Sequence, residues 1–121
     1  MPRRYFALDL KDDAASIAEY ERWHSAERIW PEIVASIRAA GILDMEIFRS
    51  GNRLVLVVDV AADFDEQAKR AADAADPRVQ AWENLMDTFQ QPLPWAEAGQ
   101  KWVPMTRLFS LADCIAEDNP R

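Results

Sequence analysis

Residues 53–60 read Arg-Leu-Val-Leu-Val-Val-Asp-Val, and the apolar run from Leu54 to Val58 decides the fold. A strand that is apolar at consecutive positions has both faces covered, which is typical of a central strand. Residues 42–48, just before it, alternate between apolar and polar side chains, as a half-buried strand does. The apolar side of this earlier strand is expected to carry Leu43, Met45 and Ile47. The turn at residues 49–52 contains Gly and Asn, which tolerate positive φ, so the pattern predicts a hairpin.

A strand and two helical segments precede this hairpin. Residues 3–10 read as a strand. Ser16 and Glu19 have the spacing of a capping box, which predicts a helix that starts near Ser16 and runs past Tyr20 and His24. The dipeptide at residues 30–31 interrupts this helix, because the residue before a proline avoids helical angles. A second segment then follows over residues 32–40 and stops at Gly41.

The chain after the hairpin repeats this pattern of two helices and a strand. An Asp-x-x-Glu start signal at residues 63–66 precedes an alanine-rich helix over residues 67–75. Asp76 and Pro77 then supply the N-cap and first residue of another helix. Its apolar positions are Val79, Trp82, Leu85, Met86 and Phe89. Residues 101–111 are expected to form the last strand.

The order of the expected elements is β-α-β-β-α-β, with both helical regions split in two. This order predicts an α+β fold of the ferredoxin-like split βαβ type, with a four-stranded antiparallel sheet and helices on one face. Residues 1–111 form the single domain, and residues 112–121 are expected to be a loose polar tail. Since residues 54–58 present apolar side chains to both faces of the sheet, we expect a homodimer that packs through the uncovered sheet face.

Charge and composition exclude several classes of protein. Asp and Glu number 21 against 14 Lys and Arg, and the net charge of −7 disfavours nucleic acid and anionic membrane as partners. No apolar run is long enough to span a bilayer or to form a secretory signal. The single cysteine, Cys114, permits no internal disulfide, and a cytoplasmic location is expected. One His and one Cys cannot build a Cys/His zinc site. The acidic groups Asp12-Asp13 and Asp63-Asp65 coincide with helix starts, so we expect capping rather than metal binding.

His24 is the only histidine and the natural candidate for acid/base chemistry at neutral pH. It follows Tyr20 by four residues, so both side chains share one helix face, about 5–6 Å apart at Cβ. The competing interpretation is a surface histidine at a helix end. Trp82 heads the apolar face of its helix, and Trp30 stands at the helix break; each fills the core or supplies an aromatic wall to a pocket for a sugar ring.

Together these residues resemble a known family. The chain resembles the L-rhamnose mutarotase family over residues 3–111. The resemblance rests on Tyr20-x-x-x-His24, the run at residues 29–33, Trp82 followed by Leu85-Met86, and the closing strand expected over residues 105–111. The resemblance implies a dimeric α/β-barrel that interconverts the α and β anomers of a 6-deoxy sugar without a cofactor or metal. It gives His24 the place of the proton donor, and it gives Tyr20 and Trp82 sugar-contacting places.

The sequence also departs from this family pattern. Met45 stands where a second sugar-contacting tyrosine is expected, and Glu83 replaces the second residue of a tryptophan pair. These changes alter the pocket wall, so L-fucose competes with L-rhamnose as the expected neutral substrate. Glu83 or a water is a candidate for the second proton acceptor. Trp30 completes the set of expected substrate-binding residues.

Two other functions share this order of elements, because a fold does not determine a function. The first is a dimeric α/β-barrel monooxygenase or haem-binding protein, in which His24 would be an iron ligand or a base. The second is a non-catalytic dimer that binds a small ligand. A haem absorbance band would favour the former, and sugar binding without faster anomer exchange would favour the latter.

Overall fold

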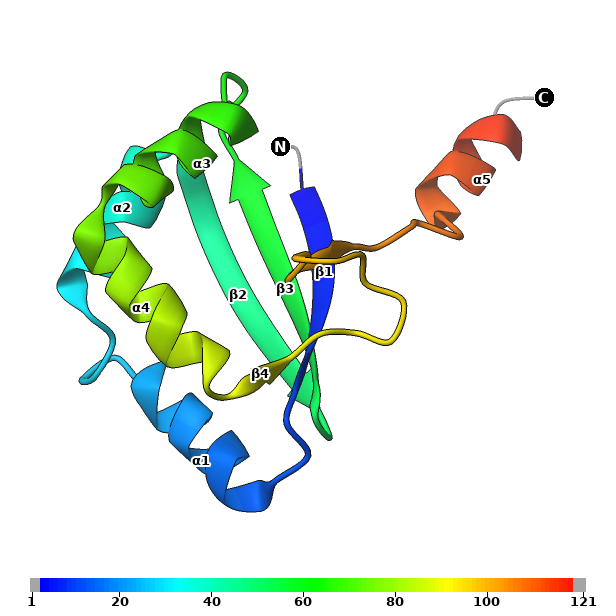
Figure 1. Cartoon of the computed structure of the whole chain (residues 1–121). Coiled ribbons are helices and arrows are strands. Elements are labelled where there is room, and N and C mark those ends of the chain that lie inside the picture. The colour runs from blue at the N-terminus through cyan, green and yellow to red at the C-terminus, as the bar shows by residue number, and fades with distance from the viewer. Residues whose placement is uncertain (1–2, 119–121) are drawn as a thin grey trace.

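The computed structural model describes residues 3–118 and contains a curved antiparallel sheet with four helices on one face (Figure 1). The three long strands are β1 (Arg3–Leu10), β2 (Ile42–Ser50) and β3 (Arg53–Val60). Among residues 3–118 the sheet has five strands, in place of the predicted four, because the short strands β4 (Gln90–Gln91) and β5 (Val103–Pro104) both pair with β1. The order is β2-β3-β1-β4, so β3 lies between β2 and β1. This confirms the central position predicted for the apolar strand.

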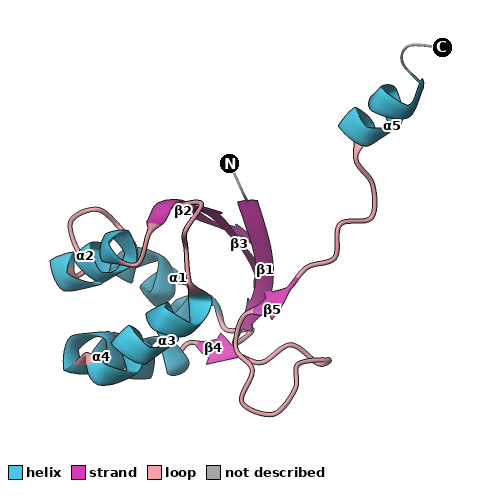
Figure 2. Ribbon diagram, turned by 90° about the horizontal axis from the view of Figure 1, so that it is seen from above, coloured by secondary structure: helices cyan, strands magenta, loops and turns pink. Residues whose placement is uncertain are grey.

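The helices form the second layer in the predicted pairs. Helices α1 (Ala14–Trp23) and α2 (Pro31–Ala39) precede the hairpin, and α3 (Glu66–Ala75) and α4 (Pro77–Asp87) follow it. Figure 2 shows all four of these helices on the concave side of the sheet. The prediction of a ferredoxin-like β-α-β-β-α-β fold with helices on one face is therefore confirmed.

Aspartates cap three of these four helices. The Asp65 and Asp76 side chains accept from backbone N–H groups at the starts of α3 and α4, which confirms a capping role for Asp65. The predicted start of α1 at Ser16 is wrong by one turn. Asp13 is the N-cap, which confirms its predicted capping role, and its carboxylate accepts from the Ser16 N–H at 2.9 Å. The helix also ends sooner than predicted, so that His24 is its C-cap residue.

The hairpin has one irregularity that the alternation of residues 42–48 does not predict. The register between β2 and β3 shifts between Ile42 and Asp44, which indicates a bulge at Leu43. Leu43 is 54% exposed, and Ile42 takes the expected place on the buried side with Met45 and Ile47. The bulge adds one residue to the alternation, so the period-2 pattern assigns Leu43 to the wrong face.

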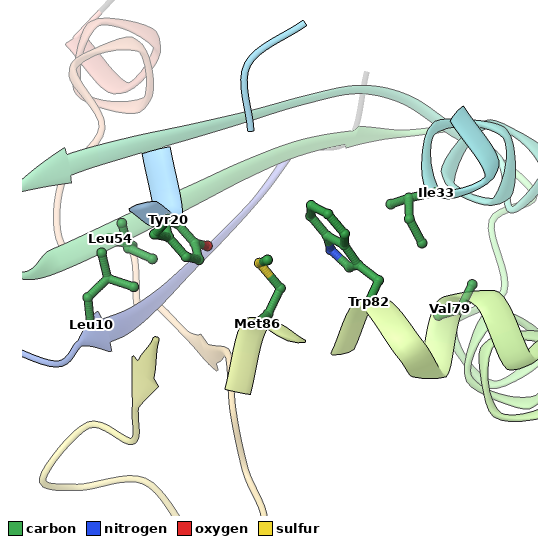
Figure 3. Packing of buried hydrophobic residues seen from close by; sticks show 7 residues of the cluster. All are labelled: Leu10, Tyr20, Ile33, Leu54, Val79, Trp82 and Met86. Atoms are coloured by element: carbon green, nitrogen blue, oxygen red, sulfur yellow. The ribbon is translucent and has the colours of Figure 1, made fainter. Parts of the chain in front are cut away.

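The core lies between the sheet and the helices. From β3 the side chains of Leu54, Leu56, Val58 and Val60 are all buried toward the helices. Figure 3 shows Val79, Trp82 and Met86 projecting from α4 toward the sheet. In the same view the Tyr20 hydroxyl points toward Met86. Burial of apolar surface between these two layers supplies most of the driving force for folding.

The predicted last strand is mostly wrong. Only two-residue strands pair with β1 at this end of the chain, namely β4 (Gln90–Gln91) and β5 (Val103–Pro104). Pro104 has no N–H to donate to the ladder, and the chain leaves the sheet after Met105, whose N–H donates to the Tyr5 carbonyl.

The predicted loose tail is in part helical. Helix α5 (Leu111–Asp118) projects away from the rest of the fold (Figure 1). At its start the Ser110 hydroxyl accepts from the Asp113 N–H at 3.4 Å, a local cap that the tail's polar composition obscures. Residues 119–121 of the predicted tail lie outside the described residues. Across residues 3–118, no helix combines the length and the apolar character needed to cross a bilayer.

Candidate active site

A cavity of about 410 Å³ lies between the helices and the sheet. This volume is in the range of pockets that hold small molecules. Five of the six predicted site residues line it together, although they come from α1, β2 and α4. They are Tyr20, His24, Met45, Trp82 and Glu83. His24 is at a helix end, as the competing interpretation expects, but it is partly buried and lines this cavity.

His24 is held in one orientation by its own helix. Its Nδ1 lies 2.8 Å from the backbone carbonyl oxygen of Tyr20. A carbonyl oxygen only accepts, so Nδ1 carries the hydrogen and Nε2 keeps a free lone pair. Burial lowers the pKa of His24 below its usual 6.5, and the hydrogen bond to Tyr20 opposes this effect without overcoming it. The neutral imidazole therefore predominates at neutral pH.

Tyr20 lies beside this imidazole. The two ring centroids are 4.4 Å apart with an angle of 38° between the planes. Burial raises the pKa of Tyr20 to about 12, although a side-chain hydrogen bond with Gln90 favours the charged form. The phenol thus remains protonated and serves as a hydrogen-bond donor to a ligand in the cavity.

Trp82 is a second aromatic neighbour of the imidazole. Its ring centroid lies 5.5 Å from that of His24, at 71° between the planes. Trp30 lies outside the set of described residues that line the cavity, and it packs edge-on against Trp82 at 5.2 Å. The guanidinium of Arg78 lies 3.6 Å above the Trp30 ring. Trp30 therefore packs against Trp82 and does not itself line the cavity. This differs from the substrate-binding place that was predicted for Trp30.

The cavity lining includes polar and charged residues that the sequence does not predict, namely Gln90, Lys101, Arg4, Ser36, Glu66, Lys69, Arg70 and Asp73. Gln90 and Lys101 matter most here. The Gln90 side-chain oxygen is buried and has no hydrogen-bond partner among residues 3–118. The Lys101 ammonium lies 2.7 Å from a Glu83 carboxylate oxygen, and both side chains line the cavity. Neither belongs to a local motif, and no signal within the sequence identifies them, because the pairing of β4 with β1 places Gln90 and the loop after β4 places Lys101.

The lining combines aromatic and apolar surface with polar and charged groups, among them charged residues of β1 and α3. The apolar middle is formed from β1, β2 and β3 by Phe6, Met45, Ile47, Leu56 and Val58. Such a surface suits the carbon skeleton of a small ligand, and His24, Tyr20 and Glu83 supply donors and acceptors for its hydroxyl groups. The free Nε2 of His24 adds a group that exchanges protons near neutral pH.

The fold and this site together define a small ferredoxin-like α+β enzyme with an acid/base histidine candidate in an aromatic cavity. The L-rhamnose mutarotase family model matches residues 3–111. The chain belongs to the L-rhamnose mutarotase family. It is therefore an isomerase, and its reaction is the interconversion of sugar anomers.

Individual relatives agree with this assignment. An L-fucose mutarotase of Xanthomonas campestris pv. campestris is 53% identical over 116 residues, which cover 96% of this chain and 93% of the relative. The crystal structure of an L-rhamnose mutarotase from Formosa agariphila matches with a TM-score of 0.66 at 20% identity, covering 92% of this chain and 99% of the other. Tetracenomycin F2 cyclase of Streptomyces glaucescens shares the fold alone, with a TM-score of 0.51, 16% identity and coverage of 91% and 98%.

Proposed function

We propose that this mutarotase acts on a 6-deoxy-L-hexose, with L-fucose preferred to L-rhamnose, and that His24 moves the proton. Support for the sugar comes from the L-fucose mutarotase that is 53% identical over nearly the whole chain. The uncharged sugar also suits an acidic protein, since no charge repulsion opposes binding. The observation that carries the proposal is the free Nε2 of His24 beside Tyr20 and Trp82 in one cavity.

The reaction needs one proton to move between two oxygens on the same carbon. In ring opening, the anomeric hydroxyl loses its proton, the C1–O5 bond breaks, C1 becomes a carbonyl and O5 gains a proton. The neutral Nε2 of His24 accepts the proton from O1 and delivers it to O5. Rotation about the C1–C2 bond then presents the other carbonyl face, and the reverse transfers close the ring. General acid/base help of this kind contributes about 10²–10⁴-fold to a rate.

This order of events refines the role of donor that the family resemblance implies. His24 first accepts a proton and then donates it, because its lowered pKa leaves the resting imidazole neutral. The Tyr20 hydroxyl donates a hydrogen bond to the oxygen on which negative charge develops, and its own proton stays in place because of its high pKa.

The remaining residues bind the sugar in this proposal. Trp82 lies against the apolar face of the ring, and Trp30 acts through Trp82 by fixing its position. Met45 provides apolar surface for the sugar's methyl group. Glu83 accepts a hydrogen bond from a hydroxyl group, and we assign it no proton-transfer step.

We also infer that two copies associate through the outer face of the sheet and form the dimeric barrel. Apolar cross-strand pairs lie on this face, with Tyr5 opposite Val57 and Phe48 opposite Val55. Tyr5 is 42% exposed and Phe48 is 54% exposed. Large apolar side chains gathered on one face are typical of an interface. We place this dimer in the cytoplasm, in agreement with the single thiol of Cys114.

Saturation-transfer NMR at the anomeric protons tests the proposed reaction and its substrate together. The protein is added to L-fucose, L-rhamnose and common hexoses at equilibrium, and the α/β exchange rate is measured for each. We expect exchange to be fastest for L-fucose, measurable for L-rhamnose and at the buffer rate for hexoses that retain a 6-hydroxyl group. Equal acceleration for all sugars, or none for the two 6-deoxy sugars, would contradict the proposal.

A further inference from the structure

Lys101 connects the loop after β4 to helix α4 at the edge of the cavity. Its Nζ lies 2.7 Å from Glu83 Oε1 and 2.6 Å from Asp87 Oδ1. Glu83 and Asp87 are four residues apart on one helix, so their like charges are neighbours. The ammonium therefore neutralises a repulsion within α4 and fixes the orientation of the Glu83 carboxylate.

The three charged side chains differ in their surroundings. Lys101 and Glu83 both line the cavity, whereas Asp87 is outside the set of described residues that do so and has a side chain that is 56% exposed. The Lys101 side chain is only 28% exposed. Burial alone would lower the pKa of Lys101, but its bonds to Asp87 and Glu83 outweigh burial and raise the pKa, so the group is charged.

Both cavity-lining partners retain hydrogen-bonding capacity. An ammonium has three donors, and the two carboxylates occupy two of them. Glu83 contacts Lys101 through Oε1, which leaves Oε2 able to accept. A donor and an acceptor side by side match two neighbouring sugar hydroxyls, one of which accepts from the ammonium while the other donates to the carboxylate.

We propose that Lys101 is a specificity-determining residue, which clamps two vicinal hydroxyls of the sugar together with Glu83 while His24 faces the anomeric carbon. This inference rests on the proposed function of the same cavity. L-Fucose carries cis hydroxyls at C3 and C4, whereas the C3 and C4 hydroxyls of L-rhamnose are trans. A clamp on the C3 and C4 hydroxyls, away from C1, distinguishes the two sugars. A site that hydrogen-bonds a hydroxyl group binds poorly a sugar whose hydroxyl points in another direction.

Substitution of Lys101 tests the clamp. Lys101→Met keeps most of the apolar stem and removes the charge and its donors. We expect the KM for L-fucose to rise about tenfold or more, the loss typical of a hydrogen bond to a charged group. We expect kcat to change much less and the preference for L-fucose over L-rhamnose to fall. Lys101→Arg, which retains a cationic donor, should recover part of both effects.

Asp87→Asn is the matched control. It removes the solvent-facing partner of Lys101 and leaves the cavity-facing pair intact, so we expect a KM within about twofold of the wild-type value. If the ion pairs merely brace the loop, Asp87→Asn and Lys101→Met will change the melting temperature alike and neither will change the sugar preference. That result, or an unchanged KM in Lys101→Met, overturns the inference.

Quenching of tryptophan fluorescence by L-fucose separates this inference from the proposed function. A wild-type protein that binds L-fucose without accelerating exchange contradicts the proposed catalysis alone. Weaker binding by Lys101→Met then still supports the clamp, and equal binding overturns it. Absence of L-fucose binding by the wild-type protein overturns both.

Discussion

The Nδ1 of His24 is 2.8 Å from the carbonyl oxygen of Tyr20, one helical turn earlier in the chain. His24 is the C-cap residue of α1, and this contact selects the tautomer of its imidazole. The same turn of helix places the phenol of Tyr20 beside the ring, at 4.4 Å between centroids. One helix end thus fixes both the proton-exchanging atom and its neighbouring donor.

The pH dependence of the reaction distinguishes a neutral from a cationic resting histidine. Because burial lowers the pKa of His24, the neutral form required for proton acceptance predominates above about pH 6.5. We expect kcat/KM for L-fucose exchange to be constant from pH 7 to 8 and to fall as the pH decreases through the lowered pKa. The exchange rate is measured by NMR and corrected for the buffer reaction at each pH. A rate that instead decreases as the pH rises from 6 to 8 would indicate that the imidazolium is the active form.

Trp82 combines a role in the core with a role in the cavity, and two substitutions separate them. Trp82 is 6% exposed, so Trp82→Ala should lower the free energy of unfolding by about 3–5 kcal/mol. Trp82→Phe keeps an aromatic face and should cost less stability while raising the KM for L-fucose. Urea denaturation and exchange kinetics measure the two effects. An unchanged KM in Trp82→Phe would argue against stacking of the sugar on this indole.

The proposed interface predicts a monomeric variant. Phe48→Glu places a carboxylate on the outer sheet face, beside Val55 on the adjacent strand. Burying an unpaired charge costs several kcal/mol, so we expect the dimer to dissociate, as measured by light scattering after size exclusion. Val34→Glu on α2 is the control, since Val34 is 39% exposed on the helical layer. A wild-type protein that elutes as a monomer at micromolar concentration would contradict the interface.

Substitution of Gly41 is expected to lower the stability of the protein without a steric clash. Its φ is 89°, and an added Cβ would meet Ala61 and Phe64 at 3.8 Å, which is ordinary contact. Gly41→Ala should therefore destabilise the protein through the backbone alone, by about 1–2 kcal/mol. The free energy of unfolding in urea measures this, and a value equal to that of the wild-type protein would show that the turn adapts.

The hairpin, the split helices and the left-handed stop at Gly41 were predictable because each has a local signal. Tyr20 and His24 were predictable for the same reason, since one helical turn relates them. The start of α1 was misplaced because Ser16 and Asp13 both offer local cap signals and the carboxylate is the N-cap.

Long-range contacts account for the larger errors. The strand predicted over residues 101–111 shortens to β5, because pairing with β1 depends on tertiary position and stops after Pro104. Lys101 reaches Glu83 across 18 residues of sequence, and no periodicity relates them. The exclusion of Trp30 from the cavity depends on its packing against Trp82, which only the fold determines.

Proton transfer by His24 is tested by comparing His24→Ala with the wild-type protein in anomeric exchange of L-fucose at pH 7.5. We expect a folded variant with unchanged circular dichroism and an L-fucose affinity within a few-fold of the wild-type value, whose enzymatic exchange has fallen by at least about 10²-fold. A folded His24→Ala protein that exchanges the anomers at the wild-type rate would show that His24 does not transfer the proton.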